Sequence, residues 1–206
     1  MQSEQDDKVM GASMLAVAEA SNEAHDEAVG PDAPIVEAIL RKDCRTAVAL
    51  SASKHGPAIG RLCMAMVGSQ AEASELAQET LLTAFEAFAL YRGDGSIRAY
   101  LFGIARNLCA RHLEMRVRRE ARLRLVHDAR NVAQDASETA ALRQEAEHMR
   151  QALAQLRPTE RDAILLRFEA EMSFKEVAEA CGIDEPTARK RVSRALARLR
   201  EIVGVA

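Results

Sequence analysis

Apolar residues recur every three or four positions along most of residues 34–203, which is the spacing of amphipathic helices. The clearest example is EASELAQETLLTAFEAFAL at residues 72–90, where Leu76, Leu82, Phe85 and Phe88 are expected on one apolar stripe. Runs of alternating β-branched residues, which would mark strands, are missing. With only 10 glycines and 5 prolines in 206 residues, the pattern predicts an all-α protein.

Interruptions of this pattern separate the expected helices. The KHGP segment at residues 54–57 is expected to end the first helix, and Gly68 the second, because proline and glycine break helices or cap their ends. The expected helices run from Pro34 to Leu50, Ala58 to Val67, Glu72 to Leu90, from near Ile97 onward, Ala146 to Leu156, and over ERDAILLRFEA after Pro158.

The end of the chain carries two further helices in a specific arrangement. Ser173 and Glu176 form the S-x-x-E pattern of a capping box, which starts a helix over FKEVAEAC. Gly182 marks its end, and Asp184 can cap a last helix that tolerates Pro186 in its first turn. A helix, a short glycine-bearing turn and a basic helix are typical of a helix-turn-helix.

Residues from about Leu125 to Ala140 are polar and aperiodic, which predicts a flexible linker between two small helical domains. The expected division is an acidic, mobile N-terminal extension at 1–33, a first domain at 34–122, the linker at 123–143 and a helix-turn-helix domain at 144–206.

The net charge of −3 conceals an uneven distribution of charge. Residues 1–40 hold nine acidic residues and one lysine, a balance of −8, whereas the remainder holds 27 basic and 22 acidic residues, a balance of +5. The bases concentrate at Arg106–Arg124 and at Arg189–Arg200, and the second stretch contains no acid. Two basic patches predict a polyanion that is contacted at two places.

Several classes of function find no support in the sequence. No P-loop, G-x-G-x-x-G or G-x-S-x-G motif and no H-x-x-x-H pair is present, so we expect neither an enzyme nor a cofactor, a metal or a small-molecule substrate. The absence of an apolar run of ~18 residues and the acidic N-terminus predict a cytoplasmic chain without membrane insertion. The cysteines are expected as small apolar residues rather than disulfides: Cys44, Cys63, Cys109 and Cys181.

The last helix is the strongest candidate for a binding site. Val177, Ala178, Ile183, Val192, Leu196 and Leu199 fall where the two helices of the helix-turn-helix pack together. A merely solvated helix usually alternates the sign of its charges, so the run of bases favours DNA binding. The residues that are left to point outward are Thr187, Arg189, Lys190, Ser193 and Arg194.

A second candidate surrounds the glycine-bearing loop before the helix at Ile97. Tyr91 and Tyr100 could stack on an unpaired base while neighbouring bases hold phosphates. Tyrosines beside arginines are more often the edge of a core, and this alternative stays open. The polar neighbours are Arg92, Arg98, Arg106, Asn107 and Arg111.

Glu75, Gln78 and Glu79 lie off the apolar stripe of the helix at 72–90. No histidine stands at a matching spacing, and the setting is not apolar enough to tune a carboxylate for catalysis. An exposed polar face that meets a protein partner is therefore the better interpretation.

In this order, the segments resemble those of an extracytoplasmic-function (ECF) sigma factor of bacterial RNA polymerase. AEASELAQETLLTAFEAF and AYLFGIARNLCARHLEMRVRR are similar to two helices of the family's sigma-2 domain. LRPTERDAILLRFEAEMSFKEVAEACGIDEPTARKRVSRALARLR is similar to its sigma-4 domain, and the resemblance covers about residues 34–203.

The resemblance implies an alternative sigma factor that binds core RNA polymerase, directs it to promoters and promotes DNA opening. Glu75, Gln78, Glu79 and Leu82 would bind core polymerase, and the final helix would read the minus-thirty-five element as duplex. A probable anti-sigma factor is implied as a further partner. The minus-ten element would be read by Tyr91, Arg92, Ser96, Arg98, Tyr100, Arg106, Asn107 and Arg111.

This chain departs from the family pattern at three positions of the second helix: Tyr100 stands where tryptophan is usual, Arg111 where a polar or acidic residue is common, and Glu114 where arginine is common. These departures leave the preferred minus-ten sequence open. Two other functions remain as alternatives: a helix-turn-helix regulator that acts without polymerase, and a sigma-like decoy for an anti-sigma protein.

Overall fold

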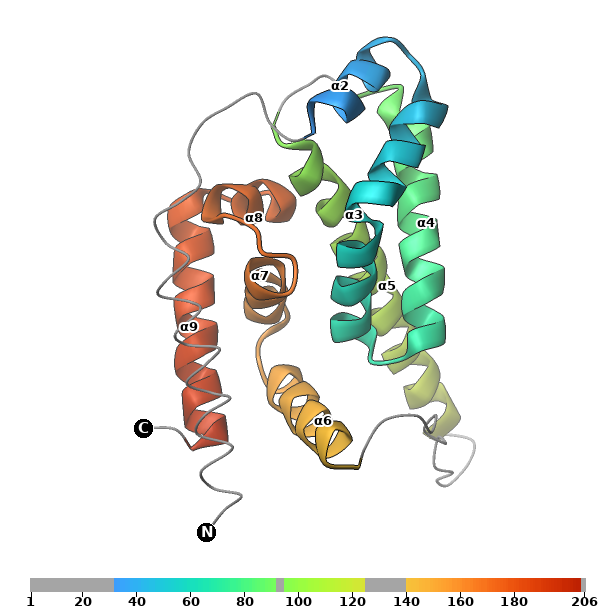
Figure 1. The fold of residues 1–206 in the computed structure, drawn as a ribbon. Helices are drawn as coiled ribbons and strands as arrows, with labels where there is room; N and C mark the ends of the chain where they lie inside the picture. The colour runs from blue at the N-terminus through green and yellow to red at the C-terminus, as the bar shows by residue number, and fades with distance from the viewer. Residues whose placement is uncertain (1–31, 92–94, 125–139, 205–206) are drawn as a thin grey trace.

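The computed structural model describes residues 32–91, 95–124 and 140–204, and for 120, 122–124 and 140–146 the backbone alone. These residues form eight α-helices and no strand, so the predicted all-α fold is confirmed. We call α2–α5 the N-terminal unit and α6–α9 the C-terminal unit. Figure 1 shows the two units side by side, and the contacts between them join α8 to α5 and α7 to α3.

The N-terminal unit begins with α2 (Ala33–Leu40) and α3 (Cys44–Val67). Asp32 precedes α2 and accepts hydrogen bonds from His55 (Nε2 to Oδ1, 2.8 Å) and Lys54 (Nζ to Oδ1, 2.7 Å) on α3. Burial opposes ionisation of this carboxyl, but the two bonds outweigh it, so the pKa of Asp32 is lowered. The start of α2 is thereby fixed against the middle of α3.

The predicted break at KHGP is wrong, because α3 continues through Pro57. A proline clashes mainly with the Cβ and the N–H of the residue before it, and that residue, Gly56, has no Cβ. The buried face of α3 also runs uninterrupted through Ser51, His55 and Ile59. Packing on both sides of the proline therefore offsets the lost backbone hydrogen bond.

The end of α3 and the start of α4 agree with their sequence signals. Gly68 ends α3 in the left-handed conformation, with φ of 77°, and the side chain of Ser69 caps α4 (Gln70–Phe88) by accepting from the N–H of Glu72.

The apolar stripe of α4 differs from the predicted one. Of the four predicted residues, Leu76 and Phe88 are buried, whereas Leu82 is 67% exposed and Phe85 44% exposed. Leu82 follows Leu76 by six residues, which turns it about 240° around the helix axis. The buried stripe instead steps by three or four residues: Ala73, Leu76, Thr80, Ala84 and Phe88. Leu82 and Phe85 therefore face solvent.

The second unit contains α6 (Ala140–Ala154), α7 (Pro158–Phe168), α8 (Phe174–Cys181) and α9 (Glu185–Val203). The capping box of Ser173 and Glu176 is confirmed by both of its hydrogen bonds, and Gly182 ends α8 with φ of 64°. Asp184 caps α9 by accepting from the N–H of Thr187 at 2.9 Å. The predicted helix-turn-helix is thus confirmed as α8 and α9.

The two units share one continuous apolar core. A Cβ placed on Gly103, near the start of α5 (Ile97–Arg124), would lie only 3.2 Å from the carbonyl oxygen of Ala180 on α8. Only a glycine fits comfortably at such an approach of two backbones. The predicted linker spans 123–143 and the predicted N-terminal extension 1–33. Most of both, 125–139 and 1–31, lies outside the residues that the structure describes, whereas 123–124 end α5, 140–143 begin α6 and Ala33 begins α2.

Candidate nucleic-acid interface

The outward face of α9 carries the predicted duplex-reading residues. Its inward face is formed by Ala188, Val192, Ala195 and Leu199, all buried, while Ile183 and Leu196 pack at the edge of the core. The first half of α9 thus presents polar and basic groups on one side. Arg189, Lys190, Ser193 and Arg194 are exposed, and Thr187 is half-buried.

The stretch Arg189–Arg200 contains no acid of its own, yet two of its bases have acidic partners elsewhere. Arg189 donates from Nε and Nη2 to one carboxylate oxygen of Glu185, at 3.1 and 2.5 Å. Arg198 lies 3.3 Å from Oε2 of the buried Glu160 on α7. The acids come from an earlier turn and from another helix, so the sequence of the basic stretch does not reveal them. Arg198 is thereby a structural cation of the C-terminal unit.

Tyr91, before the loop, and Tyr100, in the first turn of α5, both pack against the core of the N-terminal unit. The rings of Tyr91 and Tyr100 lie 5.3 Å apart, and Tyr100 also contacts Phe88 at 6.5 Å between centroids. The Tyr91 hydroxyl donates to the carbonyl oxygen of Gly95 at 2.9 Å, and burial raises the pKa of Tyr100. Arg92 lies outside the described residues. Both rings are half-buried, so they pack at the edge of the core and still reach the surface.

The start of α5 is engaged by the C-terminal unit. The backbone N–H of Ser96 donates to Oε2 of Glu179 at 2.9 Å, and its hydroxyl donates to Glu176 at 3.4 Å. Arg98 donates to the carbonyl oxygen of Ala170 and lies 4.0 Å from the carboxylate of Glu176. Two predicted single-strand contacts thus already have acidic partners in this arrangement.

Arg106, in the middle of α5, completes the same contact. Its Nη1 lies 3.4 Å from Oδ2 of Asp162 on α7, and its Nη2 donates to the side chain of Asn107 at 2.6 Å. Burial raises the pKa of Asp162, and the nearby Arg106 and Arg161 oppose that shift. Asn107 and Arg111 are exposed on the adjoining surface. The structure therefore brings the predicted residues of α5 together on one surface. Arg98 and Arg106 on this surface are in contact with acidic side chains of the C-terminal unit.

The outer face of α4 gathers the remaining predicted site residues. Glu75, Gln78 and Glu79 are exposed, as is Leu82. Phe85 adds an exposed ring that the sequence analysis assigned to the core. A surface of carboxylates around two large apolar side chains is typical of a protein contact.

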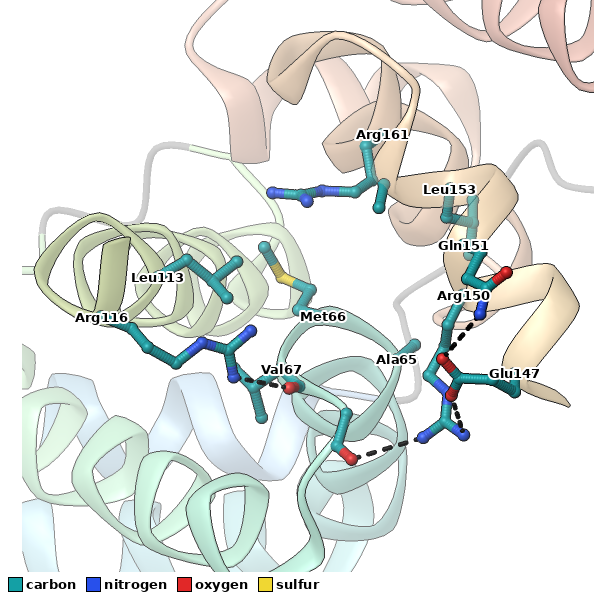
Figure 2. Close-up of a pocket in the computed structure, with 12 residues that line it drawn as sticks. Ala65, Met66, Val67, Leu113, Arg116, Glu147, Arg150, Gln151, Leu153 and Arg161 are labelled. Atoms are coloured by element: carbon teal, nitrogen blue, oxygen red, sulfur yellow. Dashed lines mark hydrogen bonds and ion pairs between the residues drawn. The ribbon is translucent and has the colours of Figure 1, made fainter. Parts of the chain in front are cut away.

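A cleft of about 320 Å³ lies where the two units meet, between α3 and α5 on one side and α6 and α7 on the other. Figure 2 shows its arginines turned toward the end of α3: Arg116 donates to the carbonyl oxygen of Val67 at 3.2 Å, and Arg150 to that of Gly68 at 3.4 Å. Cations at the C-terminal end of a helix stabilise it. Arg150, from α6, therefore ties the second unit to the end of α3.

The described residues contain no cluster of histidine, cysteine and carboxylate side chains suited to a metal ion. Cys63 and Cys109 are buried and Cys44 and Cys181 half-buried, and all four are free thiols. Over the same residues, no helix has the length and apolar content of a membrane span.

Comparison with known proteins matches both units. The description "Sigma-70 region 2" fits residues 52–122, and "Sigma-70, region 4" fits residues 147–199. The ECF RNA polymerase sigma factor EcfG of Rhodopseudomonas palustris is 30% identical over 149 residues, which cover 72% of this chain and 81% of the relative. The RNA polymerase sigma-H factor of Pseudomonas aeruginosa is 31% identical over 179 residues, covering 80% and 89%.

Two solved structures are similar in fold. CnrH, in complex with the cytosolic domain of CnrY, superposes with a TM-score of 0.63 at 22% identity over 82% of this chain and 95% of that one. The sigma factor RpoE of Bartonella quintana, in complex with the anti-sigma factor NepR, gives a TM-score of 0.59 at 27% identity over 76% and 96%.

Three observations point to the same family. They are the order of the helices, the helix-turn-helix at the end of the chain, and the similarity to relatives over most of the chain. The chain belongs to the extracytoplasmic-function group of the sigma-70 family, non-catalytic initiation factors that bind core RNA polymerase and direct it to promoter DNA.

Proposed function

We propose that the outward face of α9 reads the minus-thirty-five element as duplex, that the surface around the start of α5 reads the minus-ten element as single strand, and that the outer face of α4 docks on core polymerase. The domains that carry these roles are 34–122 and 144–206. The observation that carries the proposal is the division of α9 into a packed face and an exposed basic face, since a recognition helix needs both.

The residues assigned to duplex reading have the chemistry that base readout requires. Arg189 and Arg194 supply planar forks for guanine edges, and Lys190 and Ser193 supply phosphate contacts. A regulator that acts without polymerase would leave the exposed face of α4 and the match to region 2 without a role. A decoy that never touches DNA would leave the basic face of α9 without one.

The arrangement in which the C-terminal unit packs on the start of α5 is the proposed closed form of the chain. Carboxylates of the C-terminal unit occupy donors at the start of α5. Asp162 binds Arg106, Glu176 lies by Arg98, and Glu179 accepts from the N–H of Ser96. Carboxylates in these places mimic the phosphates of a DNA strand, so the minus-ten surface becomes free only when the two units separate. Binding to core polymerase is proposed to favour the separated form.

An anti-sigma factor is the proposed inhibitor. CnrH and the RpoE of Bartonella quintana are both seen in complexes, the latter with an anti-sigma factor, and this chain shares their fold. A partner that binds both units in the closed form would keep both DNA surfaces inactive. The proposed site of action is the cytoplasm, where the polymerase and the DNA are.

The first prediction concerns α9. Replacing both Arg189 and Arg194 by alanine should lower start-specific run-off transcription by sigma-free core polymerase roughly tenfold or more, because each bidentate base contact contributes about 1–3 kcal/mol. Arg41→Ala, which removes the exposed arginine that follows α2, is the control and should leave transcription unchanged. Equal activity of the double variant and the control would exclude α9 as the reading helix.

The second prediction concerns α4. Leu82→Arg should weaken binding to core polymerase about tenfold or more, since burying a leucine contributes about 1.5–3 kcal/mol. Leu40→Arg is the matched control, because Leu40 is 69% exposed and Leu82 67% exposed, on different helices. Fluorescence anisotropy of labelled chain titrated with core polymerase measures both affinities. A loss of the same size in both variants would contradict a specific role for α4.

The third prediction concerns the closed form. Asp162→Asn combined with Glu179→Gln should raise the affinity of the full chain for a single-stranded minus-ten oligonucleotide about five- to tenfold, because the ion pair of Asp162 with Arg106 and the hydrogen bond of the Glu179 carboxylate with the N–H of Ser96 no longer compete with the DNA. Glu169→Gln combined with Glu201→Gln removes two exposed carboxylates of the same unit and so controls for the change in net charge. If the double variant and this control bind the oligonucleotide equally, the carboxylates do not mask the surface.

A further inference from the structure

Phe174, the first residue of α8, lies beside the proposed reading face of α9. The guanidinium carbon of Arg189 is 4.5 Å from the centroid of its ring, and that of Arg167 is 5.1 Å from the same centroid. The ring is half-buried, whereas the neighbouring Val177 and Ala178 are buried and supply the packing of α8 on α9. Phe174 therefore packs at the edge of the core and also holds these two cations.

The guanidinium of Arg189 is held from two directions. The ring of Phe174 offers its face, and Glu185, one turn earlier on α9, accepts from Nε and from Nη2. An arginine side chain has many rotamers, and a ring and a carboxylate together select one of them. A side chain that is already oriented loses less conformational freedom when it binds.

The bonds to Glu185 also determine which donors of Arg189 are left for a ligand. The carboxylate takes the Nε–H and one N–H of Nη2. Three donors remain, both of Nη1 and the second one of Nη2, and one donor from each of these two nitrogens lies along the end edge of the planar group. Two parallel donors on one edge match the O6 and N7 acceptors of guanine in the major groove.

Arg167 stabilises the ring on which Arg189 rests. It lies on α7 and donates from Nη1 to the carbonyl oxygen of Met172 at 3.0 Å, just before α8 begins. Burial lowers the pKa of Arg167, and the positive charge of Arg189 lowers it further, while the carboxylate of Glu176 opposes the shift. The aromatic ring lets the two cations approach each other, because its face attracts both.

We propose that Phe174 is a positioning residue for promoter reading, and that the Phe174 ring and Glu185 orient Arg189 to select a guanine in the minus-thirty-five element. Phe174 acts through Arg189 and does not itself need to touch DNA. This inference rests on the proposed function of α9, and it adds the residues that orient Arg189 toward the guanine edge.

The test uses the full chain bound to core polymerase. Selection from a random duplex pool first gives the preferred minus-thirty-five sequence. Affinities are then measured for that duplex and for duplexes in which each G·C pair is changed in turn to A·T. Discrimination at a pair is the ratio of the affinity for the preferred duplex to the affinity for the duplex changed at that pair. Arg189→Ala should abolish discrimination at one G·C pair. At that pair, Phe174→Leu should lower discrimination about 3- to 10-fold, the range expected for a lost cation–π contact.

Phe174→Tyr keeps the ring and should retain discrimination within about twofold of the unchanged chain, which a general loss of packing would not explain. Phe174→Met serves as a second variant without a ring, and thermal unfolding verifies that each variant folds. In the Arg189→Ala background, Phe174→Leu should change discrimination no further, because the residue that it orients is gone.

Discrimination that is unchanged in folded Phe174→Leu and Phe174→Met, although Arg189→Ala abolishes it, would overturn the inference and leave the proposed role of α9 intact. A pair other than G·C at the position that depends on Arg189 would overturn the choice of guanine. An Arg189→Ala variant that binds and discriminates like the unchanged chain would overturn both the inference and the proposed role of Arg189.

Discussion

The packing of α8 against α5, where Gly103 faces the backbone of Ala180, holds the N-terminal and C-terminal units together. A Cβ at this position would lie 3.2 Å from the carbonyl oxygen of Ala180, so the two helices would have to move apart by a few tenths of an ångström. With the helices in contact, the carboxylates of α7 and α8 reach the donors at the start and middle of α5. The shared core and the arginine from α6 at the end of α3 stabilise the same arrangement.

This packing gives one set of donors two alternative partners. Arg98, Arg106 and Ser96 bind carboxylates within the chain or, in the proposed open form, the phosphates and bases of DNA. Moving a carboxylate such as Asp162 out of water has a large cost, as its raised pKa indicates, so its attraction to Arg106 is partly offset. A contact of this kind favours one orientation of the two units with little net stability, which is consistent with the proposed separation of the units.

Much of the fold could be predicted from the sequence, because helix caps and periodicity are local. Ser173, Gly182 and Asp184 mark the ends of helices through residue type alone. The continuation of α3 through Pro57 and the exposure of Leu82 depend on packing between helices, and periodicity over a short stretch did not identify either. Glu160 and Asp162 are distant in sequence from the arginines they bind, and no local pattern signals such pairs.

The central claim is that the C-terminal unit covers the minus-ten surface in the free chain and leaves it when polymerase binds. Spin labels carried by unnatural amino acids at the exposed positions Ser74 on α4 and Ala197 on α9 leave the four native cysteines untouched. Pulsed electron resonance should give one narrow distance distribution in the free chain and a longer distance in the complex with core polymerase. A broad distribution in the free chain, or the same narrow distance in the complex, would contradict the account.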